Sequence, residues 1–83
     1  MIKKMSYEKH IRKAREAVKG TTGWNRFIAI AHHFDDLEHP HAEYTLNQLA
    51  SDRVHNPCSD RKFAARVMSE MAYLVATNEE LVA

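Results

Sequence analysis

Apolar residues recur every three or four positions along most of the chain, as in helices that each bury one face. This spacing predicts four helices, over residues 6–19, 23–37, 45–53 and 59–76. Their apolar faces form the predicted core, which contains Ile11, Val18, Trp24, Phe27, Ile30, Ala31, Phe34, Leu46, Leu49, Phe63, Val67, Met71 and Leu74. The pattern therefore predicts an all-α fold, built as a small four-helix array.

Polar residues and glycine indicate where the first two helices begin and end. Ser6 can cap the first helix, and Gly20 can close it, since glycine readily adopts the left-handed conformation that follows many helices. The loop over residues 21–23 then caps the second helix. Apolar residues cover roughly half the circumference of that helix, so we expect it to be the central helix of the core.

Two starting points fit the third helix. Thr45, followed three residues later by Gln48, forms a capping box, in which both side chains bond to backbone amides of the first turn. Alternatively the helix starts at Pro40, whose fixed φ suits the first helical position, and continues through Ala42. Both starting points place the same leucines on the side of the core.

The fourth helix has a clear start and an open end. Pro57 breaks the chain, and Ser59 can cap the helix that follows. The Thr-x-x-Glu pattern at residues 77–80 is a second capping box, which predicts a final helical turn. A minimal wing is the alternative, with residues 74–76 paired against residues 81–83 as two very short strands.

The stretch over residues 44–73 resembles the helix-turn-helix core of DNA readers, because a short helix, a turn and a longer helix follow one another. The resemblance implies that the longer helix is a recognition helix. Lys62, Arg66 and Ser69 share one of its faces and could meet phosphates and base edges. The connection over residues 51–58 is longer than the turn of that motif and lacks its usual glycine.

Charge is distributed unevenly, although the whole chain carries a formal net charge of only +1. Residues 1–19 contain seven lysines and arginines against two glutamates, whereas residues 20–57 contain two arginines against five carboxylates. This asymmetry indicates a charged partner or pairing between the two segments. We expect duplex DNA or an acidic protein surface to contact Lys9, Arg12, Lys13, Arg15, Arg61, Lys62, Arg66 and Ser69.

A chain of 83 residues has room for one domain with a small core. We expect a single helical domain over residues 1–83, in which a basic N-terminal helix over residues 1–20 packs on a helical core over residues 23–83. A homodimer would give so small a domain further buried surface. Cys58 is the only cysteine, which favours a reducing, cytoplasmic setting, and no apolar run approaches the roughly 18 residues of a membrane span.

A segment rich in histidine and acid, over residues 32–41, contains candidate metal ligands. His32 and Asp36 lie four residues apart and are neighbours on one helix face, and imidazole with carboxylate is a competent ligand pair for zinc. The chain has no HExxH motif and no pair of cysteines, so we expect a polar surface without a metal or cofactor. Protonation of the histidines at about pH 6.5 would make this surface less negative.

No catalytic pattern is present in the sequence. There is no glycine-rich phosphate loop and no nucleophile motif, and Cys58 with the nearby His55 has no third group that we can assign. We therefore expect a protein that is not an enzyme. Two functions fit the pattern. One is a small helix-turn-helix-like DNA-binding regulatory protein, and the other is a small all-α module that binds another protein as an inhibitor, adaptor or dimer, without nucleic acid.

Overall fold

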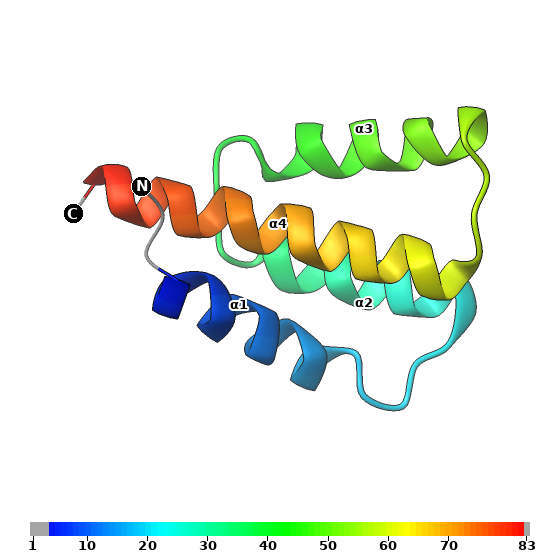
Figure 1. Ribbon diagram of the computed structural model, residues 1–83, viewed down its shortest axis with the longest axis horizontal. Coiled ribbons are helices and arrows are strands. Elements are labelled where there is room, and N and C mark those ends of the chain that lie inside the picture. The colour runs from blue at the N-terminus through cyan, green and yellow to red at the C-terminus, as the bar shows by residue number, and fades with distance from the viewer. Residues whose placement is uncertain (1–3, 83) are drawn as a thin grey trace.

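The computed structural model describes the backbone of residues 4–82 and the side chains of residues 6–77. Four helices follow one another along the chain: α1 (Lys4–Ala17), α2 (Gly23–Asp35), α3 (Ala42–His55) and α4 (Asp60–Val82). Successive helices run in opposite directions (Figure 1). Within residues 4–82 there is no strand, so the prediction of an all-α fold with four helices is confirmed.

Helices α2 and α4 form the centre of the molecule, because each of them contacts the other three helices. Helices α1 and α3 flank this pair on opposite sides (Figure 1) and make no contact with each other within the described residues. The expectation of a central second helix is therefore confirmed, and α4 shares that position. Outer grooves lie between α1 and α4 and between α2 and α3.

The largest fully buried side chains all come from α2 and α4. They are Phe34, Phe63, Ile30, Met71 and Val67. Burying each such side chain stabilises the fold by about 1.5–3 kcal/mol relative to leaving it exposed. The predicted core residues Val18, Leu46 and Leu49 are also buried, and four others pack against the core while half-buried: Ile11, Phe27, Ala31 and Leu74.

Trp24 is the exception, because 51% of it is exposed, and its assignment to the buried core was wrong. Its ring stacks parallel to that of Phe63 at 6.3 Å between centroids and lies 4.6 Å from the ring of Phe27. Trp24 is the second residue of α2 and therefore sits at the end of the helix array. Partners cover part of the indole there, and solvent reaches the rest.

Helix α3 begins earlier than the capping box predicted, and that prediction was wrong. The N–H of Thr45 donates to the carbonyl oxygen of His41 at 3.0 Å, so Thr45 already lies inside the helix. The start at Ala42 is close to the alternative start at Pro40. Ala42 is buried, so extending the helix by one turn places another apolar side chain in the core.

The predicted cap of α4 is confirmed, since the N–H of Lys62 donates to Oγ of Ser59 at 3.2 Å. The predicted end at residue 76 was wrong, because α4 continues to Val82 without a break. The hydroxyl of Thr77 donates back to the carbonyl oxygen of Tyr73 at 2.8 Å, as threonine does inside a helix, and so does not start a new turn. Residues 77–82 are thus helical, and no wing forms within the described residues.

The loop between α1 and α2 and the start of α1 match the predictions only in part. Gly20 has φ +80°, the left-handed conformation expected where the first helix closes. Ser6 lies inside α1, which already includes Lys4, and so it is not a cap. Thr22 occupies the N-cap position of α2 but makes no side-chain cap hydrogen bond. The hydroxyl of its neighbour Thr21 instead donates to the carbonyl oxygen of Val18 at 2.5 Å.

Helices α3 and α4 follow the order helix, turn, helix, with a short connection over residues 56–59. They run side by side in opposite directions (Figure 1), which is the arrangement of an αα-hairpin. In the DNA-reading motif the two helices instead cross at about 90–120°. At 14 residues α3 is also longer than the short first helix that the resemblance suggested.

Candidate functional site: a basic groove

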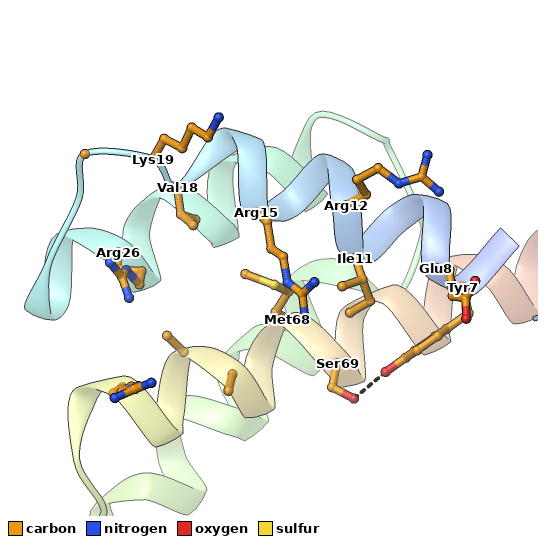
Figure 2. A pocket seen from close by; sticks show the side chains of 14 residues that line it. Tyr7, Glu8, Ile11, Arg12, Arg15, Val18, Lys19, Arg26, Met68 and Ser69 are labelled. Atoms are coloured by element: carbon orange, nitrogen blue, oxygen red, sulfur yellow. Dashed lines mark hydrogen bonds between the residues drawn. The ribbon is translucent and has the colours of Figure 1, made fainter. Parts of the chain in front are cut away.

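A groove of about 1060 Å³ lies between α1 and α4 (Figure 2), and we call it the basic groove. Five cationic side chains line it: Arg12, Arg15, Lys19, Arg26 and Arg61. Its apolar lining comes from Ile11, Val18, Ala64, Ala65 and Met68. Glu8 is the one carboxylate among the residues that line it, so the groove is strongly cationic although the chain is nearly neutral.

The spacing of residues along α1 produces this combination. Ala14 and Val18 lie four residues apart and are buried, which fixes the face that α1 turns toward the other helices. Arg12 and Arg15 of α1, and Lys19 in the turn that follows it, lie at three- and four-residue spacing beside that face, so the second half of this edge is cationic. Lys19 also forms an exposed ion pair with Glu16 at 3.1 Å, which contributes little to stability.

The side chains of Arg12, Arg15 and Lys19 point in different directions (Figure 2). Arg15 extends between the helices toward Met68 on α4, whereas Arg12 and Lys19 point away from α4. All three side chains are exposed. The groove thus offers one guanidinium in its interior and further positive charge along its outer edge.

Arg26 is held in place by the preceding loop. Its Nε and Nη2 atoms donate to the carbonyl oxygen of Thr21 at 3.2 Å and 2.7 Å, and the residue is half-buried. Sequence reasoning missed Arg26 as a site residue, because a contact made through a folded-back loop leaves no periodic signal. The nearest signal is its place on the polar side of a helix whose other side is apolar.

Arg61 supplies the α4 side of the groove near the start of that helix. Asp60 is its neighbour, but the Asp60 carboxylate accepts a hydrogen bond from Nη2 of Arg53 at 2.5 Å. Part of the negative charge beside Arg61 is therefore compensated from the other side of α4. Farther along the groove the hydroxyls of Tyr7 and Ser69 share a hydrogen bond of 2.7 Å, which links α1 to α4 (Figure 2).

The structure brings together half of the predicted contact residues. Arg12, Arg15, Arg61 and Ser69 line the basic groove, whereas Lys9, Lys13, Lys62 and Arg66 do not. Nη2 of Arg66 instead lies 3.3 Å from Asp52 of α3, on another side of α4. The predicted recognition face is therefore divided: Ser69 points toward α1, and Arg66 pairs with α3.

The histidine and acid segment is spread over a helix end and a turn. His32 and Asp36 are both exposed, and no group of three or more His, Cys, Asp or Glu residues is placed to hold a metal within the described part of the chain. The N–H of His41 donates to Nδ1 of His39 at 3.0 Å. Burial lowers the pKa of His39 below its usual value, and the neighbouring His41 lowers it further.

His33 is the most constrained member of the segment. It is half-buried, its ring meets that of Phe34 edge-on at 4.9 Å, and its Nε2 atom is buried without a hydrogen-bond partner. Burial lowers the pKa of His33, and the nearby His10 and Lys13 of α1 lower it further, while Asp36 acts in the opposite direction. His33 is therefore a neutral imidazole facing α1 at neutral pH.

None of the described helices has the length and apolar character that a bilayer-spanning segment requires. Cys58 is exposed in the connection between α3 and α4. Comparison with protein-family models, curated proteins and solved structures finds no match to this chain.

Proposed function

We propose that this protein binds duplex DNA, and that the basic groove contacts the phosphate backbone. The observation that supports this proposal is the gathering of five lysine and arginine side chains around one groove that has a single carboxylate in its lining. Guanidinium groups suit phosphates, because their planar set of donors can bond two phosphate oxygens at once. Four of the five cations are arginines.

The chemistry of the groove favours backbone contacts over reading of bases. Contacts to phosphates fix the position of a protein on DNA but carry no direct sequence information. Helix α4 packs against α1 and α3 along its two sides, so it does not stand clear of the molecule as a recognition helix does. We therefore propose binding with little sequence preference. A regulatory role would then depend on the site on DNA to which the protein is recruited, and not on a sequence that it reads.

Replacement of Arg61 by glutamine tests the proposal against a matched control on the same helix. Arg61 lines the basic groove, whereas its neighbour Lys62 is equally charged and exposed but does not. We expect Arg61→Gln to weaken binding to a randomised duplex pool by about three- to tenfold at low salt, as loss of one phosphate contact does. Lys62→Gln should weaken it by less than about twofold. Fluorescence anisotropy of a labelled duplex measures both.

If Lys62→Gln and Arg66→Gln weaken binding more than Arg61→Gln does, DNA is read through the face first expected from the sequence. If all these variants bind as the native chain does, the basic groove has no part in DNA binding.

An acidic protein partner is the second candidate, and the apolar lining of the groove favours it. Ile11 is only half-buried and Met68 lies opposite α1, so an apolar side chain of a partner could add contacts that phosphates cannot make. Pull-down from a native lysate, with and without nuclease, separates the two candidates. Loss of the captured material after nuclease treatment supports DNA, and a complex that survives nuclease supports the acidic protein.

A further inference from the structure

A second groove, of about 380 Å³, lies between α2 and α3, and we call it the α2–α3 groove. Its apolar lining comes from Phe27, Ile28 and Ala31 of α2 and from Leu46 of α3. Of the five helix pairs in contact, α2 and α3 share the least extensive contact. The two helices therefore leave apolar side chains between them only partly covered.

Two exposed apolar side chains lie on the same side of α2. Ile28 in the groove is 39% exposed, and Trp24, one turn earlier on α2, is 51% exposed. Residues four apart lie above one another on a helix, so these two side chains form a continuous apolar strip that leads into the groove. Exposed apolar strips of this kind are typical of surfaces that bind a partner.

The charge around the α2–α3 groove is opposite to that of the basic groove. Asp35 of α2 and Glu43 of α3 are exposed and line it, and no lysine or arginine does. His32 is its only other ionisable lining residue. An occupant that complements this groove therefore presents apolar side chains to its floor and cationic side chains to its two carboxylates.

We propose that the α2–α3 groove binds a basic amphipathic helix of a protein partner. An apolar cleft between two helices is a recurring receptor for such a helix, which inserts side chains spaced three and four residues apart. Nucleic acid does not suit this groove, because Asp35 and Glu43 would repel phosphates. This proposal is independent of DNA binding, since the two grooves share no lining residue.

A second copy of the chain does not offer the required helix. Its own basic amphipathic helix is α1, and the apolar face of α1 is already in use, because Ala14 is buried and Tyr7 and Ile11 pack against the core. Presenting that face to another copy would require α1 to leave its own fold. The occupant is therefore a helix from a different protein.

The test uses a synthetic peptide of leucine and lysine that forms an amphipathic helix, labelled for fluorescence anisotropy. We expect saturable binding to the native chain, and Ile28→Lys should weaken it by about ten- to hundredfold, because it removes an apolar contact and adds a repelling charge. Leu37→Lys is the matched control. Leu37 is 42% exposed, close to the value for Ile28, but does not line the groove, so binding should change by less than about twofold.

Removal of the two carboxylates gives a second measurement that does not alter the apolar floor. Asp35→Asn with Glu43→Gln should weaken binding and reduce its dependence on salt, whereas Asp36→Asn with Glu70→Gln removes the same charge elsewhere and should leave both unchanged. Far-UV circular dichroism verifies that all variants fold. If the two double variants weaken peptide binding equally, the attraction is a general effect of charge, and the proposal is overturned. Equally tight binding of a leucine and glutamate peptide would also overturn it.

Discussion

A single arginine, Arg53, links the connection between α3 and α4 to the core. Its Nη2 atom donates to the carbonyl oxygen of Cys58 at 3.0 Å and to Oδ1 of Asp60 at 2.5 Å. Its guanidinium carbon also lies 4.7 Å from the centroid of the Phe63 ring. Because the Arg53 side chain is only 22% exposed, these interactions are partly shielded from water and from salt.

Replacement of Arg53 by lysine should lower the free energy of unfolding by about 1–2 kcal/mol. Lysine keeps the charge but lacks the planar guanidinium that stacks on the Phe63 ring. Urea denaturation measures the change. Arg66→Lys is the control, because Arg66 makes one exposed ion pair with Asp52, and it should cost less than about 0.5 kcal/mol. Equal costs would contradict the special role of Arg53.

Trp24 and Arg26 illustrate what the sequence could not predict at this scale. Helical spacing assigns Trp24 to an apolar face, but whether that face is covered at the end of a helix depends on where its neighbours end. Arg26 belongs to the basic groove because the loop at Thr21 holds it there, and that contact has no counterpart in the spacing. Both outcomes depend on tertiary structure.

At the scale of elements, the sequence predicted the number, order and approximate position of the helices. The errors lie at helix ends, where a local capping pattern competes with burial. At α3 the burial of Ala42 favours a helix that begins before the capping box of Thr45 and Gln48. At α4 the hydroxyl of Thr77 donates to the carbonyl oxygen of Tyr73, one turn earlier, and so does not cap a new helical turn. The capping pattern at Ser59 was correct, because the N–H of Lys62 donates to the serine hydroxyl.

The contact between α1 and α2 should respond to pH through His33. Burial and the neighbouring His10 and Lys13 lower the pKa of His33 in the folded state, so the unfolded chain takes up the proton at a higher pH. The free energy of unfolding should therefore fall as the pH drops through about 6.5, and it should level off once the folded state is also protonated.

Thermal unfolding at a series of pH values, between about 7.5 and 5, tests this prediction. His33→Gln should show a smaller loss of stability in acid than the native chain, with a remainder from His39, whose pKa is also lowered. His32→Gln, an exposed neighbour, should retain the native dependence. An unchanged pH dependence in His33→Gln would contradict the assignment.

At the scale of the whole molecule, the fold converts a charge pattern along the chain into two different faces. Most of the basic N-terminal segment forms α1, whereas the carboxylates of the acidic middle lie at the end of α2, in the turn that follows it and on α3, which is separated from α1 by the central pair (Figure 1). The sequence predicted this asymmetry, and four of the eight predicted contact residues came together in the basic groove. It could not predict the division of the α4 face, because that depends on which helix packs on each side.

Binding of a randomised duplex pool across a range of salt concentrations tests the central claim most directly. With contacts from the five cations of the basic groove, the logarithm of the affinity should fall linearly with the logarithm of the salt concentration, with a slope between about −3 and −4.5. The affinity should differ little between duplex sequences. Absence of binding at about 50 mM salt, or a slope near zero, would contradict the account.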